Sequence, residues 1–165
     1  SLLMQAGGRA GRDAAHSARS EMWVQTQHPT HPLFEALKRH DYIAFATQQL
    51  EERAIAGMPP FAFQALVRAD ARTQEVAQGF LGAASAAATE AAIDSVAQVT
   101  LYPPVPMTIQ RVANIERAQM LVESPSRAAL QRFLAAWHST LQQTRQQPEH
   151  KGLIRWAVDV DPLVI

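Results

Sequence analysis

The clearest hydrophobic pattern in the chain lies towards its C-terminal end, where large apolar residues recur every three or four positions. This spacing predicts one buried face of an amphipathic helix. Ser124 is expected to cap the helix, with Pro125 at its first position. The apolar positions are Leu130, Phe133, Leu134, Trp137 and Leu141.

Four other segments alternate apolar with polar residues, and this period of two predicts half-buried β-strands. The segments cover residues 63–68, 107–110, 117–123 and 154–160. The residues expected on the core side of the last strand are Ile154, Trp156, Val158 and Val160.

An alanine-rich segment from Thr73 to about Val99 has apolar residues at helical spacing, although Gly79 and Gly82 weaken it locally. The resulting order is strand, helix, strand, strand, helix, strand. This order is that of the split β-α-β, or ferredoxin-like, arrangement. We therefore predict a mixed α/β (α+β) domain over residues 58–165.

A helical connector is predicted over residues 31–57, ahead of that domain. Pro32 is a favourable first residue for one helix, and Asp41 is a favourable N-cap for a second. Gly57 suits the C-terminal cap, and the two prolines that follow it prevent the helix from continuing. The domain boundary is therefore expected just after Gly57.

Residues 1–30 are interpreted as the closing part of a larger domain. Residues 2–4 are apolar and have no obvious partners nearby, and a short strand is predicted from Met22 to Thr26.

Within this part, the run Q-x-x-G-R-x-G-R starts at Gln5 and includes Gly8, Arg9 and Arg12. Glycine allows the backbone to approach a ligand closely, and arginine matches phosphate oxygens with a planar fork of donors. Such arginines can neutralise the charge on a transferring phosphoryl group. A solvated basic loop is the alternative interpretation.

Composition and charge restrict the possible functions. The 165 residues carry no net charge at neutral pH, which disfavours a histone-like nucleic-acid binder but permits a local basic face. There is no cysteine, so we expect neither disulfides nor a thiolate metal site, in keeping with a cytoplasmic protein. No apolar run is long enough to span a bilayer.

Two pairs of possible metal ligands are more simply explained as ordinary structure. His28 and His31 lie in a turn without further ligands nearby. Asp159 and Asp161 are expected to face solvent or to pair with an arginine. We therefore predict no metal site.

The stretch from residue 110 to 155 is rich in arginine, and it either contacts DNA phosphates or is a solvated surface.

The run that starts at Gln5 resembles the arginine-finger motif of superfamily-two helicases, and the following motifs resemble the primosomal replication-restart helicases of the PriA family, in the same order. These motifs cover nearly the whole chain, which is similar to the C-terminal fragment of that family. The motifs are Trp23-Val24-Gln25-Thr26, His31-Pro32, Asp41-Tyr42, Leu50-Glu51-Glu52-Arg53, Pro59-Pro60-Phe61, Pro104-Val105-Pro106, Ser126-Arg127, and Trp156 with Asp159-Val160-Asp161-Pro162.

This resemblance implies an ATP-dependent 3′–5′ DNA helicase of the bacterial cytoplasm, which uses Mg²⁺ and acts at forked, branched and single-stranded DNA. Gln5, Gly8, Arg9 and Arg12 would contact ATP, with the two arginines in the catalytic role. The family's zinc would not be bound by this chain. The resemblance also implies docking to other primosome proteins and to the acidic tail of single-stranded DNA-binding protein.

For that acidic tail, the resemblance assigns a docking role to Arg127 and Gln131. The two residues are one helical turn apart, so their side chains should project together, close to the positive end of the helix dipole.

Two other functions are compatible with the predicted fold. A free-standing RNA- or ribosome-binding module would give Arg9 and Arg12 no role. A small-molecule regulatory domain would need a glycine-rich loop after the first strand, where this chain has Asp70-Ala71-Arg72.

Overall fold

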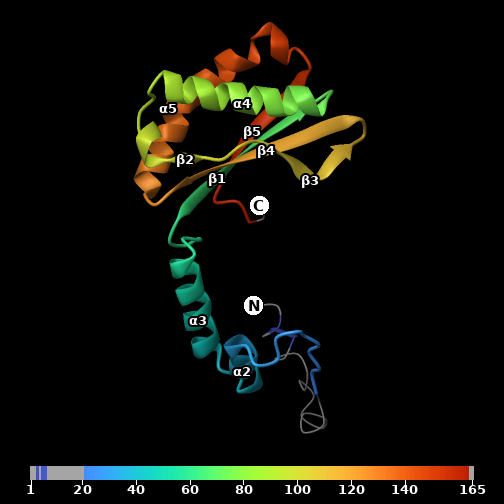
Figure 1. The fold of residues 1–165 in the computed structure, drawn as a ribbon, viewed down its shortest axis with the longest axis vertical. Helices are drawn as coiled ribbons and strands as arrows, with labels where there is room; N and C mark the ends of the chain where they lie inside the picture. Colours follow the sequence, from blue (N-terminus) through green and yellow to red (C-terminus); the bar gives the residue numbers. More distant parts are fainter. Residues whose placement is uncertain (1–2, 4, 7–20, 164–165) are drawn as a thin grey trace. The chain divides into compact units, whose positions relative to one another are not determined.

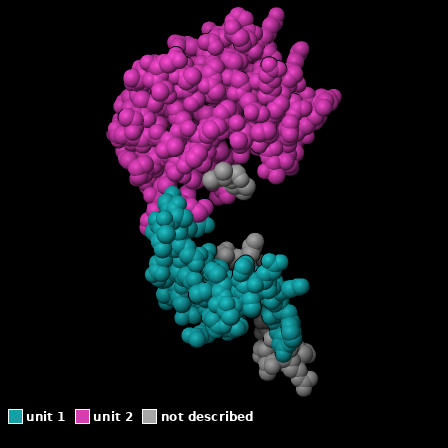
Figure 2. All heavy atoms as spheres, viewed as in Figure 1, with its two compact units in different colours: residues 1–57 teal, residues 58–165 magenta. Residues whose placement is uncertain are grey.

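The computed structural model describes residues 3, 5–6 and 21–163. The chain divides into two compact units, residues 1–57 and residues 58–165, which are coloured separately in Figure 2. The boundary between Gly57 and Met58 is the one that the sequence pattern predicts.

The first unit contains the two predicted connector helices, α2 (Pro32–Lys38) and α3 (Tyr42–Ile55). The His31 ring accepts a hydrogen bond from the Leu33 N–H, and the Asp41 carboxylate accepts one from the Ala44 N–H, 2.9 Å away. Gly57, with φ of +61°, follows α3 in the left-handed conformation that favours glycine.

The strand predicted from Met22 to Thr26 is wrong, because residues 21–30 form no regular element and the Trp23 side chain is 89% exposed. A strand needs a neighbouring edge with which to pair. All the strands found among the described residues belong to the second unit, so no described residue of the first unit offers this segment such an edge.

The second unit is a sheet covered by two long helices (Figure 1). Strand β4 (Ile115–Ser124) pairs with β1 (Phe63–Ala71) and β3 (Val105–Val112), and β1 also pairs with β5 (Leu153–Val160), all antiparallel. The order β3-β4-β1-β5 is that of the split β-α-β arrangement predicted from the sequence. The elements are β1 (Phe63–Ala71), α4 (Gln74–Glu90), the 3₁₀ turn η2 (Val96–Gln98), β2 (Thr100–Leu101), β3 (Val105–Val112), β4 (Ile115–Ser124), α5 (Arg127–Arg145), the 3₁₀ turn η3 (Pro148–His150) and β5 (Leu153–Val160).

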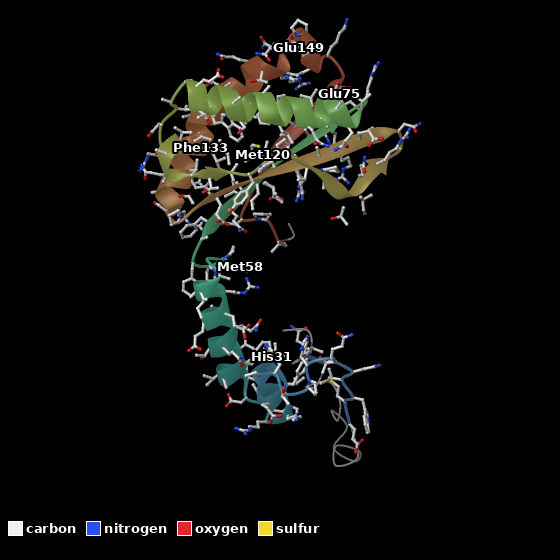
Figure 3. All side chains as sticks on the ribbon, in the orientation of Figure 1. His31, Met58, Glu75, Met120, Phe133 and Glu149 are labelled. Atoms are coloured by element: carbon white, nitrogen blue, oxygen red, sulfur yellow. The ribbon has the colours of Figure 1, made fainter. Side chains whose placement is uncertain are left out.

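Helices α4 and α5 lie on the same side of this sheet, so the second unit has one face covered by helices and one without (Figure 1). Side chains on the covered face form the core, including Met120 of β4 and Phe133 of α5, which are labelled in Figure 3. Trp137 lies fully buried among them, as predicted, and its indole Nε1 donates to the Ala84 carbonyl at 2.8 Å. The opposite face carries no helix, although the β1 residues Gln64, Leu66 and Asp70, which alternate with the core positions, are also buried.

The alanine-rich composition predicts a helix that continues to about Val99. Helix α4 instead ends at Glu90. Ala92 and Ser95 have φ of +46° and +63°, which are left-handed values that an α-helix cannot contain. The chain then adds the short strand β2, which pairs with β4 and was not predicted.

Two smaller predictions are also corrected. Ser126, not Ser124, caps α5, because its hydroxyl accepts from the Ala129 N–H while Ser124 donates to the Gln98 carbonyl. A bulge between β1 and β5 pairs Ala71 with Leu153, so Leu153 is buried and Ile154 is 43% exposed instead of facing the core.

Candidate functional site

Arg127 lies where three segments of the second unit meet. It is the first residue of α5, and its guanidinium carbon lies 4.7 Å from the centre of the Phe63 ring at the start of β1. Its Nη1 donates a hydrogen bond of 2.8 Å to Oδ2 of Asp161, which directly follows β5. The guanidinium is thus held on two sides while its side chain stays 56% exposed.

The surroundings of Arg127 suit a carboxylate. Guanidinium and carboxylate form short, charge-assisted hydrogen bonds, and a helix N-terminus favours negative charge. Asp161 already shows that a carboxylate oxygen fits against this arginine. Gln131, one turn further along α5, is exposed, so both residues assigned to partner docking are accessible from solvent.

A second charged group lies on the face of the sheet that the helices leave uncovered. Asp70 of β1 has Arg117 of β4 and Arg155 of β5 as its direct cross-strand neighbours. Its Oδ2 accepts from Nε of Arg155 at 2.6 Å, and its Oδ1 lies 3.5 Å from Nε of Arg117. Arg68 of β1 pairs with Asp159 at 3.1 Å.

A hollow of about 180 Å³ lies here, and its lining residues are Arg68, Asp70, Arg117, Arg155, Trp156 and Ala157. The sequence interpretation missed Arg68 and Asp70 as site residues, because they precede the arginine-rich stretch. The available signal was their position on the polar side of a predicted strand, opposite its alternating core residues.

The arginine-rich stretch of residues 110–155 does not form a single basic surface. Arg132 donates to the Ser95 hydroxyl, and Arg145 donates to the Ile154 carbonyl at 3.4 Å. Arg117 and Arg155 share Asp70 on the uncovered face. Asp159 and Asp161, which were expected either to face solvent or to pair with an arginine, each pair with one, Arg68 and Arg127 respectively.

Another hollow, of about 650 Å³, lies between α5 and β5. The Trp156 ring forms part of it, 5.3 Å from the His138 ring, and also packs near Phe80 in the core. Its lining residues are His138, Gln142, Arg145, Gln146 and Trp156.

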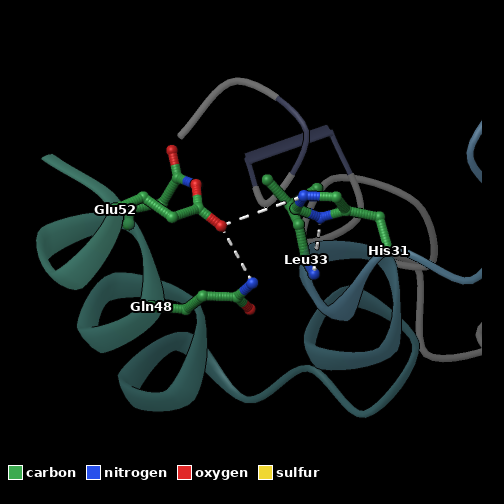
Figure 4. Close-up of polar contacts among 5 residues, drawn as sticks. His31, Leu33, Gln48 and Glu52 are labelled. Carbon is green, nitrogen blue, oxygen red and sulfur yellow. Dashed lines mark hydrogen bonds and ion pairs between the residues drawn. The ribbon is translucent and has the colours of Figure 1, made fainter. Parts of the chain in front are cut away.

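His31 has a structural role in the first unit (Figure 4). Its Nδ1 accepts from the Leu33 N–H at 3.2 Å, and its Nε2 lies 3.8 Å from Oε1 of Glu52. Gln48 donates to the same carboxylate oxygen at 3.0 Å. In the described part of the chain, no group of three or more potential ligands is arranged to hold a metal ion.

Of the residues assigned to ATP contact, Gly8, Arg9 and Arg12 lie outside the described residues. Gln5 is described, and it is helical and exposed. Among the described helices, none has both the length and the apolar character needed to cross a bilayer.

Comparison with known proteins identifies the family. Residues 54–163 match the primosomal protein N C-terminal domain. Over 161 residues, or 98% of its length, the chain is 34% identical to replication restart protein PriA of Haemophilus influenzae and covers 20% of that protein. It is 30% identical over 75% of its length to replication restart protein PriA of a Synechocystis species, covering 14% of it, and 28% identical over 98% of its length to the Rickettsia conorii protein, covering 22%.

The chain thus spans roughly a fifth of the length of these relatives, and the match includes the whole sheet and both helices that cover it. It also includes Arg127 and the arginines around Asp70. The chain belongs to the PriA family of replication restart proteins, in which it corresponds to the primosomal protein N C-terminal domain and the segment before it.

Proposed function

We propose that this chain is the C-terminal part of an ATP-dependent 3′–5′ DNA helicase that restarts replication at stalled forks in the bacterial cytoplasm. The observation that carries this proposal is the match of residues 54–163 to the primosomal protein N C-terminal domain. Membership of this family favours replication restart over a free-standing RNA- or ribosome-binding module.

Within the helicase, the N-terminal part of the chain would contribute to ATP hydrolysis. Arg9 and Arg12 would neutralise charge on the γ-phosphate in the transition state, with Gln5 and Gly8 beside the nucleotide. The phosphate-cradling loop with its lysine, and the acidic residues for Mg²⁺, would come from other parts of the full-length protein. The family's zinc would also be bound elsewhere, since this chain has no cysteine.

The second unit would dock partners, and Arg127 offers the best-defined position for one. We assign its guanidinium and the Gln131 amide to the terminal carboxylate of the acidic tail of single-stranded DNA-binding protein. The Phe63 ring supports the guanidinium from one side, so little side-chain entropy would be lost when the tail binds. Forked and single-stranded DNA and other primosome proteins complete the proposed set of partners.

Peptide binding to the 165-residue chain tests this assignment directly. The labelled C-terminal peptide of single-stranded DNA-binding protein should bind the parent chain. Arg127→Glu should lower the affinity of the peptide by about tenfold or more, because repulsion replaces a charge-assisted hydrogen bond. Arg132→Glu, which reverses another exposed arginine of α5, is the matched control. Equal affinities of the two variants would place the docking site elsewhere.

A further inference from the structure

The uncovered face of the sheet carries a group of charges that the proposed peptide docking does not use. Strand β1 alternates, with Ala65, Val67, Ala69 and Ala71 in the core under the helices. Arg68 and Asp70 therefore point to the opposite face. There they meet Arg117 and Arg155 around the hollow of about 180 Å³.

Asp70 holds two of these arginines in a particular way. Each guanidinium approaches Asp70 most closely through its Nε, and among the described residues Arg117 and Arg155 pair with no second carboxylate. The Asp70 side chain is only 9% exposed, whereas that of Arg155 is 73% exposed. One buried carboxylate thus pairs with two guanidinium groups, each of which has more N–H donors than a single carboxylate oxygen can accept.

Arg68 adds a third guanidinium to the wall of the hollow. Its Nη2 pairs with Asp159, but its Nε is buried and has no hydrogen-bond partner among the described residues. A buried donor without a partner is destabilising, and an acceptor that enters the hollow would offset this cost. The three arginines outnumber the two carboxylates that pair with them, so the cluster keeps a net positive charge.

We infer that this cluster of Arg68, Asp70, Arg117 and Arg155 is a binding site for a phosphate group of a nucleic-acid backbone. Arginine forks donate paired hydrogen bonds to the oxygens of a phosphodiester, which carries its charge on a group small enough to enter the hollow. The inference rests on the proposed DNA-handling function and assigns a site to it.

The lining of the hollow favours nucleic acid over an acidic peptide. Four of the six lining residues are charged, and the other two are Ala157 and Trp156. The Trp156 ring packs near Phe80 in the core, so the charged side chains supply the hydrogen-bonding groups of the hollow. Gln119, the cross-strand neighbour of Arg68 on the same face, adds a neutral hydrogen-bonding group.

The test measures binding of a fluorescein-labelled oligothymidylate to the 165-residue chain by anisotropy at several salt concentrations. Two double variants are compared, Arg117→Ala with Arg155→Ala, and Arg117→Lys with Arg155→Lys. The lysine variant keeps both charges beside Asp70, so it remains informative if the alanine variant does not fold. Arg132→Ala removes one positive charge from the helix-covered side and serves as the control.

We expect the alanine double variant to bind about tenfold more weakly at low salt and the lysine double variant about threefold more weakly, because lysine lacks the planar fork. For the alanine variant, the slope of log affinity against log salt should fall by about 0.7, as for the loss of one single-strand phosphate contact. Arg132→Ala should change affinity less than twofold.

Several results would overturn the inference. If the parent chain binds the oligonucleotide and both double variants bind it as the control does, this site is wrong although the proposed DNA role stands. If the parent chain binds no oligonucleotide at low salt, the DNA role itself fails. A loss of inorganic phosphate binding with unchanged oligonucleotide binding would indicate a site for free phosphate, and a selective loss of acidic-peptide binding would indicate a peptide site.

Discussion

The guanidinium of Arg127 is paired with a carboxylate of its own chain, because its Nη1 donates a hydrogen bond of 2.8 Å to Asp161. Asp161 has φ of +53°, and its backbone N–H donates to the Gln64 carbonyl at 2.9 Å, which anchors the residue just beyond β5. A partner carboxylate that uses the same nitrogen must displace Asp161. The pair is about half exposed on both sides, so the cost of displacement is modest.

We therefore expect Asp161→Asn to strengthen binding of the acidic peptide. Exposed ion pairs contribute about 0.2–1 kcal/mol, so the gain should reach up to about fivefold in affinity. Asparagine tolerates a positive φ at least as well as aspartate, so the backbone should be unaffected. Asp159→Asn makes the same charge change beside Arg68 and should have a smaller effect in the same anisotropy titration. Equal gains in both variants would indicate a general charge effect and not competition at Arg127.

Gln131→Ala should weaken binding of the same peptide by less than Arg127→Glu does. A neutral hydrogen bond contributes only about 1 kcal/mol, which corresponds to about fivefold in affinity. Isothermal titration calorimetry on the two variants gives the comparison. A larger loss for Gln131→Ala would mean that the amide, and not the guanidinium, is the principal contact.

Trp137→Ala should lower the free energy of unfolding of the second unit by about 3–5 kcal/mol, because the side chain is fully buried between α5 and the rest of the core. Trp137→Phe keeps most of the apolar volume but loses the hydrogen bond to the Ala84 carbonyl, so its effect should be smaller. Chemical denaturation followed by circular dichroism measures both. Trp23→Ala, at a side chain that is 89% exposed, should leave this transition unchanged.

The pKa of the Tyr102 phenol is raised above its ordinary value of 10, chiefly by repulsion from the Glu123 carboxylate and further by desolvation and by its hydrogen bond to Glu123. The folded state holds the phenol proton of Tyr102 more tightly than the unfolded state does. The protonated phenol therefore contributes to the free energy of unfolding, and this contribution is fully present below pH 10. It is lost as the pH rises through the folded-state pKa.

Glu123→Gln should therefore move the pKa of Tyr102 back towards 10. The phenolate absorbance measures this pKa, and Tyr42→Phe removes the signal of the other tyrosine in the chain. An unchanged pKa in the Glu123→Gln variant would mean that Glu123 is not its cause.

In the full-length protein, Arg9→Ala and Arg12→Ala should each abolish DNA-stimulated ATP hydrolysis while leaving folding intact. Each change removes a charge that acts mainly in the transition state, where such a contact contributes several kcal/mol, on the order of a thousandfold or more in rate. A coupled ATPase assay measures the rate, and circular dichroism checks the fold. Activity within about twofold of the parent would contradict the assignment.

Local patterns in the sequence were sufficient for most of the elements. The apolar spacing that includes Trp137 located α5 and its buried face, and alternation located β1, β3, β4 and β5. Asp41 and Gly57 marked the ends of α3. The helical period, the alternation of strands and helix capping all arise from residues that are close together in the chain. The sequence alone is therefore enough to show them.

The sequence by itself therefore determined the order of the elements, the split β-α-β arrangement and the family resemblance. Only the tertiary structure decided which charges meet. Asp70 and Arg155 are 85 positions apart, and their pairing depends on the register of β1 against β5. The same long-range pairing buries Leu153 instead of Ile154. A strand pattern states which side a residue faces, but the residue across the sheet is known only once the strands are aligned.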